Sequence, residues 1–342
     1  MEENGGMPEW LLEDNRKRKD HYVRDLDEEV FIRQFNDVLA REFPLKGDEP
    51  GHPMLFFFGL PRCGKTFFSQ VLTNCLDLGY PDNLTARFWR APHIGITLSK
   101  ILRRTTDAET SFSSDHGKTR GVLDPHDFAY FWHKHLKING IPYDYQSVRT
   151  EINWSNLRKA LQGFTNAFGK ACIMKGVNPS YHINEMAAAY EKSLFIYVKR
   201  DSIDCAVSLY RARQKNFGNL EQWYGQTPSS EVYDQLKSEP YNIQIGGQLK
   251  HLSKLYDSQL EKLDPSRYLI VDYREFCSNP TREIQKIVDR VKENFDYEIK
   301  IQNDVKAESV VYSSHSSELA YYGNLLAGLE HFGQSARLNE LD

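Results

Sequence analysis

The sequence predicts an α/β fold, a P-loop-like parallel sheet flanked by helices on both faces in a single main domain. The first observation is an apolar run, 54–58, followed directly by Gly59–Thr66, which reads GLPRCGKT. This is the pattern G-x-x-x-x-G-K-[ST], which needs a strand before it and a helix after it. The second is that short apolar runs at 171–174, 194–198 and 268–271 alternate with helical stretches. Such alternation is typical of a parallel sheet covered on both sides.

The helices that connect these strands follow from apolar spacing and from capping residues. Asp124-Pro125, for example, supplies a cap and a first-turn proline, as helix starts prefer. Residues 105–121 are polar and predict a long surface loop. The predicted helices span about 25–42, 64–77, 93–104, 124–137, 153–168, 179–190, 202–215 and 240–262.

The chain divides before the first strand, where prolines and glycines gather at 44–53. We therefore expect 1–50 to form an N-terminal extension that is partly helical, and 51–342 to form the α/β domain. The first 20 residues are polar, and we expect them to be mobile.

Composition narrows the classes of function. A formal net charge of −4 argues against a nucleic-acid-binding surface, so an anion site has to be local. No apolar run reaches bilayer length, so no membrane span is predicted. Five cysteines lack C-x-x-C spacing and predict reduced thiols and a cytoplasmic protein. They are Cys63, Cys75, Cys172, Cys205 and Cys277.

The loop predicts a bound nucleotide phosphate, because such loops turn backbone N–H groups onto an anion at a helix N-terminus. Lys65 adds a charge and Thr66 a hydroxyl. Ligands of such sheets bind beyond the carboxyl ends of the strands, which places Lys175, 199–200 and 272–273 on the same rim. Arg200 with Ser208, two helical turns further on, can hold a second phosphate.

Two enzyme classes fit these residues. In a P-loop kinase or NTPase, Thr66 and Asp272 would hold Mg²⁺ while a phosphoryl group leaves ATP. Histidine spacing on 124–137 gives no metal pair, and we assign no metal site. A nucleotide-binding module without catalysis is a third possibility.

Four blocks in order resemble the sulfotransferases that use 3′-phosphoadenosine 5′-phosphosulfate (PAPS). Residues 61–67, PRCGKTF, are similar to the family's Pro-Lys-Ser-Gly-Thr-Thr-Trp. Residues 175–179 resemble its Lys-x-x-x-Pro turn, and 200–208 fit its R-x-x-x-D-x-x-x-S pattern. Residues 273–284 are similar to its Tyr-Glu-Asp block followed by Asn-Pro and a helix. The resemblance covers about 54–290 and favours sulfuryl transfer over the kinase alternative.

The resemblance implies roles for these residues. Backbone N–H groups of Cys63 to Thr66 would hold the 5′-phosphosulfate, with Arg62 in the place of the family's catalytic lysine. Arg200 and Ser208 would hold the 3′-phosphate, and Lys175 would face the sulfuryl group. The implied cofactor-binding set is Arg62, Cys63, Gly64, Lys65, Thr66, Phe67, Arg200, Ser208 and Tyr273, and the implied catalytic set is Arg62, Lys65, Lys175 and a base.

The base is where the sequence departs from the family. Val177 stands where cytosolic members have a histidine, and 87–92 lacks the carboxylate of other branches. His93 is therefore the first candidate for the base. The remaining candidates are His116, His182, Glu109 and Asp124.

The sequence leaves the acceptor and the oligomeric state open. We expect a hydroxyl or amine of a small molecule or glycan. The family's C-terminal Arg-Lys-Gly segment is missing, and 309–318 is the candidate for part of its work. Aromatic residues expected on the acceptor side are Trp89, Phe131, Trp132, Trp154, Trp223 and Tyr224.

Overall fold

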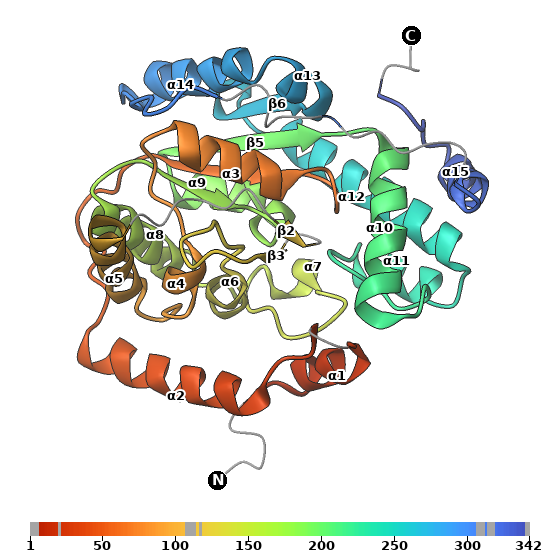
Figure 1. Ribbon diagram of the computed structural model, residues 1–342, viewed down its shortest axis with the longest axis horizontal. Helices are drawn as coiled ribbons and strands as arrows, with labels where there is room; N and C mark the ends of the chain where they lie inside the picture. The colour runs from red at the N-terminus through yellow and green to blue at the C-terminus, as the bar shows by residue number, and fades with distance from the viewer. Residues whose placement is uncertain are drawn as a thin grey trace.

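A four-stranded parallel sheet with the strand order β4-β1-β5-β6 forms the centre of the protein (Figure 1). This computed structural model describes residues 7–19, 22–106, 114–115, 118–305, 312 and 319–338. The strands of the sheet are β1 (Met54–Phe58), β4 (Cys172–Lys175), β5 (Ser193–Lys199) and β6 (Tyr268–Asp272). They agree with the four predicted strands to within a residue at each end.

Helices connect the strands and account for most of the described chain. Two-residue strands β2 (Ser114–Asp115) and β3 (Lys118–Thr119) pair within the predicted loop 105–121. The helices are α1 (Glu9–Lys17), α2 (Leu26–Glu42), α3 (Lys65–Cys75), α4 (Asn83–Ala86), α5 (Pro92–Thr105), α6 (Ala129–His135), α7 (Tyr145–Val148), α8 (Trp154–Phe168), α9 (Ile183–Ala189), α10 (Ser202–Phe217), α11 (Ser230–Leu236), α12 (Tyr241–Leu260), α13 (Tyr273–Ser278), α14 (Pro280–Phe295) and α15 (Tyr322–His331).

Successive side chains of β1 point to opposite faces of the sheet, as in any strand. The ring of Phe57 lies 5.7 Å from that of Phe68 on α3. On the other face, Phe56 packs 6.0 Å from Trp132 on α6, and Phe58 packs 5.3 Å from Tyr256 on α12. Helices therefore cover both faces, and the predicted fold class is confirmed.

The predicted helix 124–137 is wrong in its first half, because α6 begins only at residue 129. Pro125 forms a bridge with Asp82, and the His126 N–H donates to the Pro81 carbonyl at 2.8 Å. Phe128 then has φ +54°, outside the helical region. These contacts hold 124–128 as irregular backbone and leave Asp127 outside any helix.

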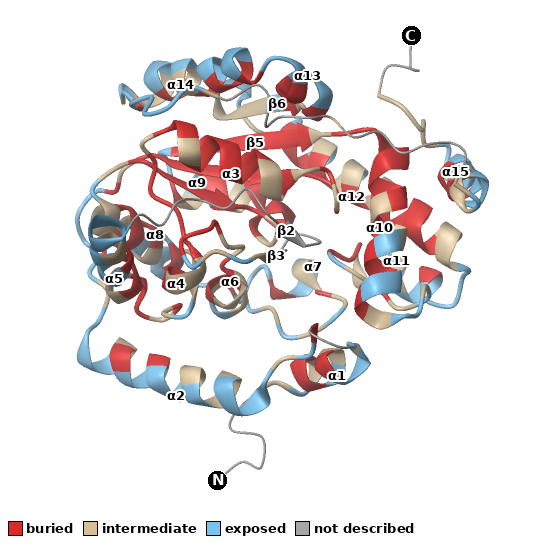
Figure 2. Cartoon of the chain, in the orientation of Figure 1, coloured by how far each residue is buried: buried red, intermediate tan, exposed pale blue. Residues whose placement is uncertain are grey.

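Within the first 20 residues, which the sequence analysis expects to be polar and mobile, the structure has a packed helix, α1. Leu11 and Leu12 are buried, and the Lys19 N–H donates to the Asn216 carbonyl at 3.0 Å, next to the end of α10. Figure 2 shows buried positions on α1, whereas α2 is mostly exposed or half-buried. The division of the chain at residue 50 stays a prediction, but α1 is packed against the α/β body.

All five cysteines are buried free thiols, as predicted. Among the described helices, none has the length and apolar character needed to cross a membrane. The compartment stays a prediction.

Candidate functional site

The loop after β1 turns into α3 through Gly64, which adopts φ +99°. A Cβ at this position would lie 2.3 Å from the Tyr273 ring, so only glycine fits here. At the start of α3, the first backbone N–H that donates to a carbonyl of the chain is that of Phe68, to Gly64 at 3.0 Å. The N–H groups before it form the open helix N-terminus that favours an anion.

Cys63 does not belong to this set of donors. Its N–H donates to the Leu60 carbonyl at 3.2 Å, and its side chain is buried. The prediction that the Cys63 N–H holds a phosphate is therefore not supported, and the available N–H groups begin at Gly64.

Lys65 is turned into the loop. Its Nζ donates to the carbonyls of Gly59 at 2.7 Å and Leu60 at 2.6 Å, and the residue is buried. Burial lowers the pKa of the Lys65 ammonium. In this arrangement Lys65 holds the loop together, which differs from the catalytic role predicted for it.

Lys175 ends β4 beside the loop. Its Nζ donates to Thr66 Oγ1 at 3.0 Å and forms an ion pair with Asp127. The Lys175 side chain is 8% exposed and that of Asp127 is 45% exposed. Burial alone would raise the pKa of the Asp127 carboxyl, but Lys175 and His126 outweigh burial and hold that pKa below its usual value. The structure thus brings a cation and a carboxylate together at the start of α3.

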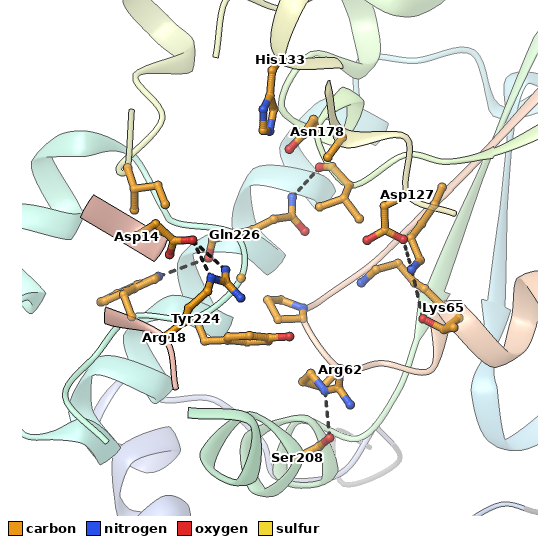
Figure 3. A pocket seen from close by; sticks show the side chains of 18 of the residues that line it. Asp14, Arg18, Arg62, Lys65, Asp127, His133, Asn178, Ser208, Tyr224 and Gln226 are labelled. Atoms are coloured by element: carbon orange, nitrogen blue, oxygen red, sulfur yellow. Dashed lines mark hydrogen bonds and ion pairs between the residues drawn. The ribbon is translucent and has the colours of Figure 1, made fainter. Parts of the chain in front are cut away.

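A second polar group lies across the pocket, where Arg62 meets Ser208 (Figure 3). Arg62 has φ +70°, a backbone conformation that is uncommon for residues other than glycine. Its Nε donates to Ser208 Oγ at 3.1 Å, and Arg200 Nη1 donates to the Arg62 carbonyl at 3.4 Å. The structure therefore joins Arg62 to Ser208 and Arg200, whereas Lys175 is the cation that contacts Thr66.

Two aromatic rings and the Asp204 carboxylate, 3.8 Å from Arg200 Nε, hold Arg200 in place. Its guanidinium carbon lies 5.1 Å from the centre of the Tyr273 ring and 5.5 Å from that of Tyr312. The Tyr312 hydroxyl donates to Asp204 Oδ2 at 2.5 Å. Tyr312 is the one described residue of the predicted supporting segment 309–318, so the rest of that prediction lies outside the described residues.

One pocket of about 480 Å³ joins the two groups. Thr66, Lys175 and Asp127 line one part of it, and Arg62, Arg200 and Ser208 line another. Helix α1 and the residue that follows it contribute a third wall, from which Asp14 and Arg18 reach the pocket (Figure 3). The volume lies in the range of small-molecule sites.

The predicted aromatic residues separate into two groups. Trp223 and Tyr224 line the pocket, as does Phe67. Trp89, Phe131 and Trp132 are buried in the core, and Trp154 packs 5.7 Å from His182. Tyr273 lies buried under Arg200 rather than on the pocket surface.

The predicted bases that the structure describes do not reach this pocket. His93 lines a separate cavity with Phe43 and Asn166, and burial lowers its pKa. His182 is buried, with its Nε2 2.9 Å from the Tyr143 hydroxyl. Asp124 is buried and accepts from the Gly121 N–H at 2.8 Å. The candidates His116 and Glu109 lie outside the described residues.

Two parts of the pocket escaped the sequence analysis. The sequence analysis missed Asp127 because it placed this residue inside a predicted helix. A carboxylate two residues after Pro125 could have indicated a site residue. Helix α1 supplies Trp10 and Asp14, and the residue after it supplies Arg18. Its apolar positions are too few and too far from any motif to indicate a site.

The magnesium ligand proposed for the kinase alternative caps a helix. Asp272 Oδ1 accepts from the N–H groups of Arg274 at 2.7 Å and Glu275 at 3.2 Å, so it caps α13. Within the residues that the structure describes, no group of three or more His, Cys, Asp or Glu side chains is placed to hold a metal ion.

Comparison with known proteins adds independent information. The model of the sulfotransferase family matches residues 53–297. The chain is similar in structure to sulfotransferase STF9 from Mycobacterium avium, with 14% identity, a TM-score of 0.53, and 95% of this chain and 81% of that chain covered. It is also similar to sulfotransferase STF1 from Mycobacterium tuberculosis H37Rv, with 13% identity, a TM-score of 0.51, and 89% and 83% covered. At such identities these structures show the fold alone. No curated protein matches the chain.

Proposed function

We propose that this chain, which belongs to the sulfotransferase family, transfers a sulfuryl group from PAPS to a hydroxyl or amine of a small-molecule or glycan acceptor. Family membership makes it a transferase of sulfuryl groups. The donor and the acceptor class are the proposed part.

The observation that carries the choice of donor is the pair of cationic groups in one pocket. The start of α3 with Lys175 suits one anionic end, and Arg62 with Arg200 and Ser208 suits another. PAPS carries a phosphosulfate at the 5′ position and a phosphate at the 3′ position. Arginine forks and a hydroxyl are the groups that proteins use to bind a phosphate.

In this assignment Lys175 and the N–H groups from Gly64 onward face the 5′ end. They stabilise the negative charge that grows on the 5′-phosphate as the sulfur–oxygen bond breaks, which is the main electrostatic contribution such a site can make. Arg200 and Ser208 fix the other end and so orient the donor. Arg62 joins this second group, which differs from the role that its place in the motif predicts.

The kinase alternative is not favoured. Thr66 accepts from Lys175, Asp272 caps α13, and Lys65 is bound to the loop's own carbonyls. None of these three groups is arranged for Mg²⁺ and a γ-phosphate, which the alternative requires.

The acceptor would enter on the side formed by α1, Trp223 and Tyr224. Asp14 and Arg18 lie on this wall as an ion pair, with a 2.8 Å separation. A mixture of aromatic rings and fixed polar groups suits a small polar acceptor with an apolar face.

Binding of the desulfated product PAP tests the donor. We expect PAP to bind at least about tenfold tighter than ADP in EDTA, because both carry two phosphates and only PAP places one at Arg200 and Ser208. Isothermal titration of both nucleotides measures this ratio. Equal affinities, or binding that requires Mg²⁺, would contradict the proposal.

A further inference from the structure

We propose that Asp127 is the general base of this enzyme, a carboxylate placed at the pocket by Lys175 that accepts the proton of the acceptor hydroxyl or amine. This inference deepens the proposed function and rests on it. It supplies the group that the motif comparison leaves missing, since Val177 stands where cytosolic members have histidine.

The placement of Asp127 is the first argument. Its Oδ1 pairs with Lys175 Nζ, and the same Nζ donates to Thr66 Oγ1 at 3.0 Å. A continuous polar chain therefore runs from the start of α3, where the leaving group would be held, to a carboxylate that lines the pocket. The side chain of Asp127 is 45% exposed, so it remains accessible to a molecule in the pocket.

The backbone around Asp127 supports this placement. The bridge from Pro125 to Asp82 and the left-handed Phe128 keep this residue out of α6. A regular helix over 124–137, as the sequence predicts, would include Asp127. The observed helix α6 begins only at residue 129, so Asp127 lies on the irregular backbone before it. The irregular segment is therefore what brings Asp127 to Lys175.

The other side chains on the pocket wall that could take up a proton, Asp14 and His133, are poorly suited to act as the base. Asp14 is held by both Nε and Nη2 of Arg18 at 2.8 Å, and both side chains are mostly covered. The His133 imidazole packs against the rings of Trp10 and Tyr130, with 5.3 Å and 5.7 Å between ring centres, on the side of the pocket formed by α1.

The proposed step balances. The acceptor O–H or N–H bond breaks and its proton passes to the Asp127 carboxylate. The acceptor atom forms its bond to sulfur while the bond from sulfur to the 5′-phosphate oxygen breaks. The electron pair of that bond leaves with PAP, and Asp127 then releases the proton to water.

Asp127→Asn tests the proposal with two readouts that move in opposite directions. Because the acceptor is unidentified, turnover is followed as PAP formed from PAPS with water as acceptor, and PAP affinity is measured by titration. We expect PAP formation to fall about 10²-fold, the effect of losing a positioned base. We expect PAP to bind threefold tighter or more, since the negative charge beside Lys175 is removed.

Asp77→Asn is the matched control, because Asp77 pairs with Lys170 in the same way but does not line the pocket. It should leave both readouts unchanged. Asp127→Glu should recover part of the turnover. If Asp127→Asn keeps wild-type turnover, or loses PAP affinity together with turnover, the assignment is wrong. If the wild-type protein fails to bind PAP, the proposed function itself fails, which is a separate result.

The pH dependence gives a third readout. The titratable groups that face Asp127 are Lys175, His126 and Lys65, and together they hold the pKa of its carboxyl below the usual value, although burial lowers the pKa of His126 itself. The base is then ionised from about pH 5 to 8, so turnover should stay flat as the pH falls through this range. A histidine base with an ordinary pKa would lose about tenfold per pH unit below about 6.5, and such a fall would overturn the assignment.

Discussion

Lys175→Met is expected to lower the turnover number by about 10²–10³-fold, the cost of removing one donor that stabilises developing charge. Lys175 is the cation in contact with Thr66 at the start of α3, and it is almost fully buried. Methionine keeps the length and apolar stem of the side chain. The expected loss is in turnover, with a smaller loss in PAP affinity, and steady-state kinetics with titration separates the two.

Lys170→Met is the control for this experiment. Lys170 lies just before β4 and pairs with Asp77, so it matches Lys175 as a lysine paired with an aspartate. It does not line the pocket. If both variants lose turnover equally, the effect comes from β4 stability and not from the site. Unchanged turnover in Lys175→Met would remove this residue from the mechanism.

Arg200→Ala is expected to weaken PAP binding by about 2–4 kcal/mol, the scale for losing one partner of a buried charged contact. ADP should lose much less, because it places no phosphate at the 3′ position. The measurement is calorimetric titration of both nucleotides. Arg200→Lys keeps the charge but loses the fork, and an intermediate loss is expected.

Arg274→Ala provides the matched control for Arg200. The Arg274 guanidinium carbon also lies over Tyr312, at 5.1 Å, and its Nη2 pairs with Asp201 at 2.6 Å. It does not line the pocket. PAP affinity should therefore stay near wild type in this variant. Equal losses for PAP and ADP in Arg200→Ala would mean that Arg200 supports the fold rather than a 3′-phosphate.

The sheet and the phosphate loop could be predicted because their signals are local. A buried parallel strand is a short apolar run, and β1 matches its prediction residue for residue. The loop requires a glycine at residue 64, where the backbone has a positive φ, and the motif in the sequence specifies that glycine. Lys175 and Arg200 then followed from the rule that ligands bind beyond strand ends, and Ser208 from its place two helical turns after Arg200.

The rest of the site depends on contacts between distant segments. Asp127 reaches the pocket because Pro125 bridges to Asp82, and no pattern within 124–137 encodes that contact. His93 was placed by chain position alone, and the structure puts it in another cavity. Arg62 turns to Ser208 through a left-handed backbone that its motif does not specify. Helix α1 lines the pocket because it packs against the rest of the protein, and its own short sequence gives no sign of that packing.

Turnover of PAPS in EDTA tests the central claim most directly. Purified protein would be incubated with PAPS or with ATP and Mg²⁺, and the nucleotide products separated and quantified. The account predicts that PAPS is converted to PAP without metal, that Lys175→Met abolishes most of this conversion, and that ATP stays intact. Phosphoryl release from ATP with Mg²⁺, together with unchanged PAPS, would contradict it.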